Sequence, residues 1–182
     1  EELNDEYQTK HENLKNYVRP EFKKIKKHSS KINKKHGKLF SIQDLLSELK
    51  IICKKNEQVV FTNGCFDVFH AGHAHILNES KKFGDILIVA VNSDKSVTNL
   101  KGPKRPINKL KKRVAVLESI EAVDYIVTFN SQTPESLIKK IQPGYLTKGS
   151  EYKKEKIVGS DFVKSYGGQV KEIKMLPQLS SS

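Results

Sequence analysis

The chain has 182 residues, a mass of 20.7 kDa and a formal net charge of +12. This length suffices for one α/β domain of about 120 to 150 residues with an appendage, and it excludes two full hydrophobic cores. No apolar run approaches the roughly 20 residues needed to cross a bilayer and the N-terminus lacks a signal-like stretch, so we expect a soluble cytoplasmic protein with no membrane partner.

The N-terminal segment, residues 1–38, differs in composition from the rest of the chain. Between Phe22 and Leu39 there are eight lysines and no acidic residue. A lysine block of this kind is usually a solvated tail, although such a charge also raises nucleic acid as a partner. We therefore predict a partly ordered basic extension over residues 1–38 and one folded domain over residues 39–182.

Helices and strands alternate from Ser41 onward. Ser41 caps a predicted helix over residues 42–54, and residues 58–62 form a strand that stops at an Asn63-Gly64 turn. A helix then runs to about Phe83 and is closed by Gly84. The remaining elements are strands over 85–91, 125–129, 145–148 and 169–175, and helices over 108–121, 134–141 (Thr133 as cap) and 160–166.

Five short apolar strands separated by helices predict an α/β fold, a Rossmann-like, doubly wound parallel sheet with flanking helices. In such sheets ligands bind beyond the carboxyl ends of the strands, where the strand order reverses. The segment from Asn63 to His73, NGCFDVFHAGH, follows the first strand and falls at this place.

Two histidines in this segment have a spacing suited to phosphate. His70 and His73 are three residues apart at the start of a helix, so their rings can face one side at the positively polarised end. Gly72 between them permits close approach, and Gly64 opens the turn. The alternative for any random pair is surface or core packing, but a glycine between the two directly after a strand and turn favours phosphate binding.

A metal site is not expected from the sequence. His75 projects away from the pair, and a zinc site formed by the three histidines lacks a fourth ligand. Cys53 and Cys65 have no metal-binding spacing and are interpreted as free thiols.

The segment from Phe61 to His73, FTNGCFDVFHAGH, resembles the first motif of the nucleotidyltransferase superfamily that contains cytidylyltransferases and adenylyltransferases. The continuation narrows this resemblance through GDILIVAVNSD (84–94), LKGPKRPIN (100–108), KRVAVLESIEAVDYIVTF (112–129), TPESLIKKIQPGYLTKGSEY (133–152) and IVGSDFVKSYGGQV (157–170). These segments look like the adenylyltransferases that make ADP-heptose from D-glycero-β-D-manno-heptose 1-phosphate. The resemblance covers residues 38–182.

The resemblance implies transfer of AMP from ATP to the sugar phosphate, with Mg²⁺ accompanying ATP and a homodimer as the assembly. The two histidines would contact the triphosphate, and Lys101 and Arg113 fall at cationic phosphate contacts of the superfamily. Further nucleotide-binding candidates are Thr62, Asn63, Gly64, Cys65, Phe66, Gly72, Asn92, Asp94, Lys148, Gly149, Ser180, Ser181 and Ser182.

The acceptor phosphate would meet cations of the loop after the second strand and of the helix that follows. Lys101, Lys104, Arg105 and Arg113 are the candidates, and the two arginines stand out because a guanidinium grips phosphate through two hydrogen bonds. Asp67 either approaches the acceptor or orients the loop.

Two other functions remain open at this point. The same fold and mechanism serve glycerol 3-phosphate cytidylyltransferases and adenylyltransferases acting on FMN. A basic nucleic-acid-binding protein that merely retains the fold is the alternative from another class, but no aromatic stacking motif accompanies the lysines, so we do not expect nucleic acid as a partner.

Overall fold

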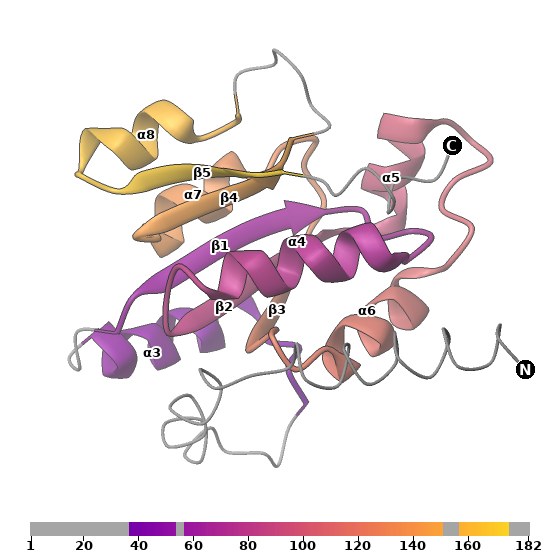
Figure 1. The fold of residues 1–182 in the computed structure, drawn as a ribbon. Coiled ribbons are helices and arrows are strands. Elements are labelled where there is room, and N and C mark those ends of the chain that lie inside the picture. Colours follow the sequence, from indigo (N-terminus) through magenta and orange to yellow (C-terminus); the bar gives the residue numbers. More distant parts are fainter. Residues whose placement is uncertain (1–36, 54–56, 151–156, 175–182) are drawn as a thin grey trace, which may run out of the picture. The chain divides into compact units, whose positions relative to one another are not determined.

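The computed structural model describes residues 37–53, 57–150 and 157–174 (Figure 1). These residues belong to one compact unit, Gly37–Ser182. The predicted extension lies outside the described residues except at its end, where Lys38 donates from its backbone N–H to Glu118 Oε1 at 3.0 Å. The division of the chain at residue 38 stays a prediction.

Six helices and five strands alternate along most of the described chain. In order they are α3 (Ile42–Cys53), β1 (Val59–Gly64), α4 (Ala71–Lys81), β2 (Ile86–Asn92), α5 (Asp94–Lys101), α6 (Leu110–Ser119), β3 (Tyr125–Phe129), α7 (Glu135–Ile141), β4 (Tyr145–Gly149), α8 (Ser160–Ser165) and β5 (Gln169–Ile173).

The strands form one parallel sheet in the order β3-β2-β1-β4-β5, which confirms the predicted fold class. From β1 the chain moves outward to β2 and β3, and it then returns to place β4 on the other side of β1. The strand order therefore reverses between β1 and β4. This is where a doubly wound sheet has its ligand crevice.

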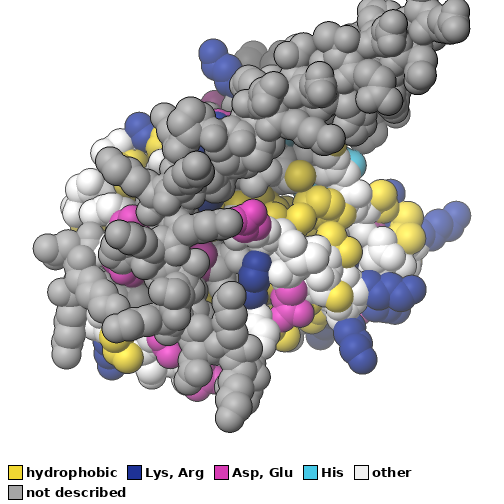
Figure 2. Space-filling view, turned by 60° about the horizontal axis from the view of Figure 1, so that its bottom comes forward, with side chains coloured by type: hydrophobic (Ala, Val, Ile, Leu, Met, Phe, Trp, Pro, Cys, Tyr) yellow, Lys and Arg dark blue, Asp and Glu magenta, His cyan; other side chains and the backbone are white. Residues whose placement is uncertain are grey.

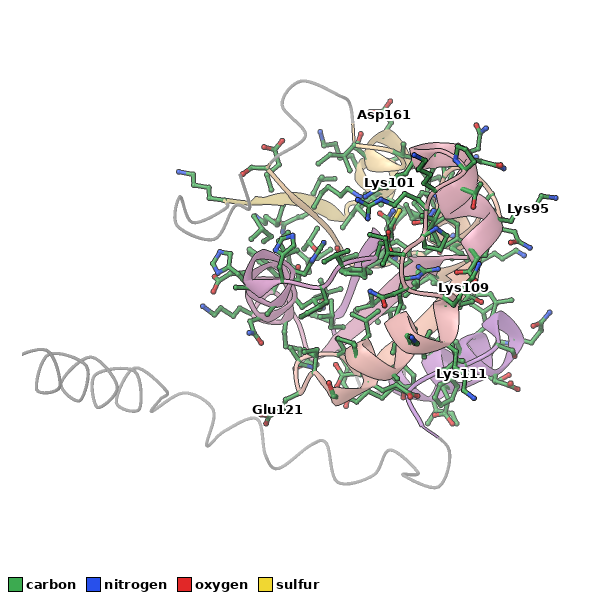
Figure 3. All side chains as sticks on the ribbon, turned by 90° about the vertical axis from the view of Figure 1, so that its right-hand side faces the viewer. Lys95, Lys101, Lys109, Lys111, Glu121 and Asp161 are labelled. Carbon is green, nitrogen blue, oxygen red and sulfur yellow. The ribbon has the colours of Figure 1, made fainter. Side chains whose placement is uncertain are left out.

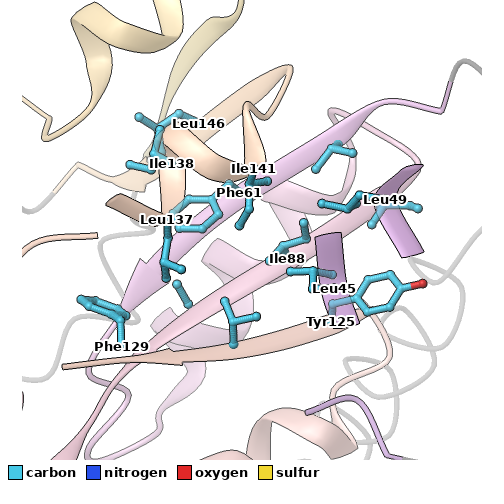
Figure 4. Packing of buried hydrophobic residues seen from close by; sticks show 14 of the residues in the cluster. Leu45, Leu49, Phe61, Ile88, Tyr125, Phe129, Leu137, Ile138, Ile141 and Leu146 are labelled. Carbon is cyan, nitrogen blue, oxygen red and sulfur yellow. The ribbon is translucent and has the colours of Figure 1, made fainter. Parts of the chain in front are cut away.

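Hydrophobic residues cover both faces of the sheet, because successive strand residues point to opposite sides. One face packs against α3, α7 and α8, with Phe61 and Ile88 among its strand residues (Figure 4). The opposite face packs against α4 and α6, with Val60 and Leu87 (Figure 1). Every residue of β2 is buried, as expected of a central parallel strand. These two layers hold the carboxyl edge of the sheet in place.

The sequence prediction missed one helix and misread several ends. Residues 94–101, expected as a loop, form α5, whose start is capped by the Ser93 side chain accepting from Ser96 N–H at 3.2 Å. Its apolar positions are too few to show a helical period. Pro134, rather than Thr133, is the N-cap of α7.

Two glycines serve close packing rather than the turns expected of them. Gly84 does not close α4, which ends at Lys81; a Cβ on Gly84 would lie 2.6 Å from the carbonyl oxygen of Gln58. Asn63 and Gly64 continue β1 instead of forming a turn.

Within the described ranges, every helix falls short of the length and apolar character that a membrane span requires.

Candidate functional site

The two histidines of the motif meet at the N-terminus of α4. His70 is the N-cap in an extended conformation, and its Nδ1 accepts from the backbone N–H of Gly72 at 3.1 Å. His73 Nδ1 accepts from the backbone N–H of His70 at 3.3 Å, and the ring centroids lie 4.0 Å apart. The two imidazoles thus cap the helix reciprocally.

These hydrogen bonds determine which ring nitrogen can serve a ligand. Because each Nδ1 accepts from a backbone N–H, the hydrogen of a neutral ring must reside on Nε2. His70 and His73 therefore each have an Nε2–H that no backbone group uses in this cap. Two such donors beside the positive end of a helix form a site for phosphate oxygens.

His73 is held in the neutral form. Its ring stacks on Phe69 at 5.5 Å and lies 5.4 Å from Phe66. Burial, together with the nearby His70 and Lys101, lowers the pKa of His73 to about 4. At neutral pH His73 is therefore a hydrogen-bond donor rather than a cation.

Phe66 lies in the loop between β1 and α4, residues 65–70, which we call the motif loop, and it holds this loop in a tight conformation. Its φ is 49°, a left-handed value that a bulky residue seldom adopts. A Cβ on Gly64 would come within 3.1 Å of the Phe66 ring, so this glycine makes room for the aromatic side chain rather than opening a turn. Gly72 is buried in the first turn of α4, where its N–H serves His70.

Cationic side chains gather where the strand order reverses. Lys148, near the end of β4, donates from Nζ to the carbonyl oxygen of Asn63, near the end of β1, at 3.1 Å. Burial lowers the pKa of Lys148. Burial also raises the pKa of the Cys65 thiol, and the charges of Lys101, Arg113 and Lys148 oppose this shift. The charges of three predicted site residues therefore act on Cys65, at the start of the motif loop.

Asp67 joins the motif loop to the connection between α5 and α6. Its side chain is buried and accepts from Arg105 Nη1 and from the Asn108 backbone N–H, both at 2.8 Å. Asn108 Nδ2 donates in turn to the Asp67 carbonyl oxygen at 2.7 Å. Burial acts to raise the pKa of Asp67, but these hydrogen bonds outweigh it and leave the pKa below its usual value. Of the two roles predicted for Asp67, this geometry favours orienting the loop.

Arg113, predicted as a phosphate contact, is enclosed by protein groups in this structure. Its side chain is 0% exposed and donates to the carbonyl oxygens of Asn108 at 3.0 Å and Cys65 at 2.6 Å, and to Asp94 Oδ1 at 2.9 Å. Asp94 Oδ1 also accepts from the Leu110 backbone N–H at 2.8 Å. Protein groups thus engage both side chains, and in this structure Arg113 positions the motif loop.

The side chains of other predicted nucleotide-binding residues form hydrogen bonds within the protein. Thr62 Oγ1 donates to the Thr147 carbonyl oxygen at 3.1 Å, and Asn92 Nδ2 donates to Ser96 Oγ at 3.0 Å. Gly149 ends β4 at the carboxyl edge. The predicted contacts Ser180, Ser181 and Ser182 lie outside the described residues.

Sequence reasoning did not identify Asn108 or Phe69 as part of this arrangement. Both fall in segments that carried the family resemblance, but neither has a charge or spacing that separates it from its neighbours. His75, interpreted as surface or packing, has Nε2 3.0 Å from the Lys174 carbonyl oxygen, outside the histidine pair.

The chain is similar to known proteins over most of its folded part. A family model described as cytidylyltransferase-like matches residues 61–178. The bifunctional protein HldE of Alcanivorax borkumensis is 46% identical over 144 residues, covering 79% of this chain and 30% of that protein. The same-named protein of Hahella chejuensis is 49% identical over 126 residues, covering 69% and 26%. The chain thus spans less than a third of the length of these curated relatives.

Two solved structures are similar in fold. A lipopolysaccharide core biosynthesis protein from Thermoplasma volcanium superposes with a TM-score of 0.55 at 28% identity, covering 66% of this chain and 97% of that one. Pantoate-β-alanine ligase from Francisella tularensis gives 0.58 at 14% identity, covering 81% and 71%, and at that identity it supports the fold alone.

Proposed function

The chain belongs to the cytidylyltransferase-like family of nucleotidyltransferases, and from this we propose that it transfers AMP from ATP to D-glycero-β-D-manno-heptose 1-phosphate. The products would be ADP-heptose and pyrophosphate. The histidine pair at the N-terminus of α4, located at the reversal of the strand order, is the observation that carries the proposal. The choice of ATP and heptose rests on the quoted sequence segments and on the similarity to HldE proteins.

The reaction is an in-line displacement at the α-phosphorus. An oxygen of the sugar phosphate forms the new P–O bond, and the bond to the bridging oxygen breaks as pyrophosphate leaves with its electron pair. A phosphate monoester is already ionised at neutral pH, so the site needs no strong general base. What it supplies is alignment and donors for the growing negative charge.

Named groups of this chain fit those two tasks. The Nε2–H groups of His70 and His73 would hold the triphosphate against the helix N-terminus, and Lys101 would neutralise charge beside them. The side chain of Arg105 is 39% exposed. It has donors beyond the one given to Asp67 and would reach the acceptor phosphate. Arg113 and Asp67 would keep these groups in place.

We propose that Mg²⁺ accompanies ATP, bound by phosphate oxygens and water. In the part of the chain that the structure describes, no group of three or more His, Cys, Asp or Glu residues could hold a metal ion. Asp67 and Asp94 each accept hydrogen bonds from protein donors. The ion would shield the charge of the phosphates.

The test is pyrophosphate release by the purified chain with Mg²⁺, comparing ATP with CTP and heptose 1-phosphate with glycerol 3-phosphate and FMN. We expect release with ATP and heptose 1-phosphate, and its loss in the His70→Ala, His73→Ala double variant. His75→Ala is the matched control, because this histidine lies on the same helix outside the pair. Release only with CTP or with another acceptor would reassign the substrate within the family.

We also propose a homodimer in the cytoplasm, on the family resemblance alone. Sedimentation equilibrium would then give twice the chain mass of 20.7 kDa. A mass equal to that of one chain at micromolar concentration would contradict the dimer.

A further inference from the structure

A run of lysines without acids lies on α5, on α6 and in the connection between them. From Lys95 to Leu117 the sequence has no Asp or Glu. Its two arginines are paired with Asp67 and Asp94. Its six lysines are all exposed, and none is in an ion pair with another described residue. We call these the α5–α6 rim: Lys95, Lys101, Lys104, Lys109, Lys111 and Lys112.

The rim borders the candidate site. Helix α5 begins directly after the carboxyl end of β2, and Asp94 at its start accepts from Leu110 N–H at the start of α6. At the other end of α5, Lys101 is near enough to influence the pKa of His73. Figure 3 shows the labelled lysines Lys95, Lys101, Lys109 and Lys111 on the side of the molecule that carries α5 and α6.

The placement of three of these lysines opposes the stability of α6. Lys109 is its N-cap and makes no side-chain capping hydrogen bond, and its first turn contains no acid. Lys111 and Lys112 follow at the second and third helical positions. Positive charge at a helix N-terminus is repelled by the helix dipole, typically by about 0.3 to 1 kcal/mol for each charge. These lysines destabilise the helix and are not compensated by an ion pair with a described residue. A functional reason for their placement is therefore expected.

The positive electric field of these lysines adds to the positive field at the N-terminus of α6, because both have the same sign. In Figure 2, basic side chains project at the right, the side on which α5 and α6 lie in Figure 1. Clustered charge of one sign beside a site raises the local concentration of oppositely charged ligands, and it can speed association by about 10- to 1000-fold.

We propose that four lysines of the α5–α6 rim, Lys95, Lys109, Lys111 and Lys112, steer anionic substrates, a nucleoside triphosphate and a sugar phosphate, toward the histidine pair without contacting them once they are bound. This inference rests on the proposed function, since both substrates of that reaction are anions. Steering of this kind acts through space, so salt screens it and removal of the charges slows association while dissociation is unchanged.

The experiment compares two variants of the full chain that lower the net charge equally. Lys95, Lys109, Lys111 and Lys112 are changed to Gln in the rim variant; Lys101 and Lys104 are kept because they are candidates for substrate contact. Lys50, Lys82, Lys140 and Lys164, exposed on or beside α3, α4, α7 and α8, are changed to Gln in the control. Each variant loses four charges, from +12 to +8.

Association and dissociation of ATP labelled on its ribose with a fluorophore are followed by stopped flow at ionic strengths of about 0.01 M and about 1 M, where the Debye length is about 30 Å and about 3 Å. At low salt we expect the rim variant to associate at least about fivefold more slowly than the control variant, with equal dissociation rates. At high salt the two should agree.

Equal slowing of both variants would overturn the proposal, because net charge alone would then account for the effect. Faster dissociation from the rim variant would also overturn it, since the lysines would be contacts. Failure of the unchanged protein to bind the labelled ATP would refute the proposed function itself. Circular dichroism and thermal unfolding of both variants identify a loss of folding.

Discussion

Replacing Arg113 by methionine would remove three hydrogen bonds while keeping an apolar stem of similar length. The lost acceptors are the carbonyl oxygens of Cys65 and Asn108 and the carboxylate of Asp94. The side chain of Asp94 is 34% exposed. Water can therefore solvate its carboxylate, and the full penalty of a broken buried ion pair does not apply. At about 1 kcal/mol for each hydrogen bond, we expect a loss of about 3 kcal/mol.

Urea unfolding measures this free energy directly, and thermal unfolding should show a midpoint lower by about 9 °C for a domain of this size. Arg113→Lys retains the charge but cannot reach three acceptors at once, so it should lose about half as much stability. The control Lys112→Met changes an exposed neighbour on the same helix. Because this change removes a charge that the helix dipole repels, its stability should be equal to that of the unchanged protein or higher by up to about 1 kcal/mol.

Turnover should fall together with stability in the Arg113 variants, because the motif loop loses its anchor at Cys65. An Arg113→Met protein with unchanged unfolding free energy and no turnover would contradict this reasoning. Arg113 would then contact the substrate phosphate directly, as the sequence resemblance implies.

Three further changes test other contacts, two of them in the site and one in the packing of the sheet. His73→Gln places an amide N–H where Nε2–H lies and His73→Asn does not, so Gln should retain at least about tenfold more turnover, and the reverse order would argue against the Nε2–H donor. The pKa of His73 falls from 6.5 to about 4 on folding. Because the unfolded chain then binds the extra proton, urea unfolding should show stability decreasing as pH falls through this range, less so in His73→Gln. Asp67→Asn should loosen the connection between α5 and α6, visible as faster tryptic cleavage after Lys104, and unchanged cleavage would refute the link. Since folding lowers the pKa of Asp67, the acid-induced loss of stability should also become smaller in this variant. Gly84→Ala places a methyl group against the Gln58 carbonyl oxygen. This crowding should cost about 1 to 3 kcal/mol. A loss below about 0.5 kcal/mol, the range of an ordinary surface substitution, would mean that the backbone at Gln58 shifts to accommodate the methyl group.

The periodicity of the chain located most of the elements. The strand predicted over residues 125–129 coincides with β3, and the other four predicted strands overlap observed ones. Helix α5 escaped detection because its eight residues have few apolar positions and are defined by the Ser93 cap and by contacts with β2 and α6. Short, polar helices depend on such contacts more than on propensity.

The sequence alone determined the chemistry of the site. Two histidines flank Ala-Gly at the junction of a strand and a helix. Their type and spacing predict phosphate binding. This binding depends on the N-terminus of a helix that is formed by residues adjacent in the sequence. Local order in the chain therefore sufficed to place His70 and His73 together.

Only the tertiary structure decided which charged residues are available to a ligand. Arg105 and Arg113 look equivalent in the sequence, yet one is 39% exposed and the other is enclosed by Asp94, Cys65 and Asn108. Their partners lie up to 48 residues away, so no local pattern reports them. Whether a charged side chain is buried and paired depends on which segments of the chain the folded sheet brings together.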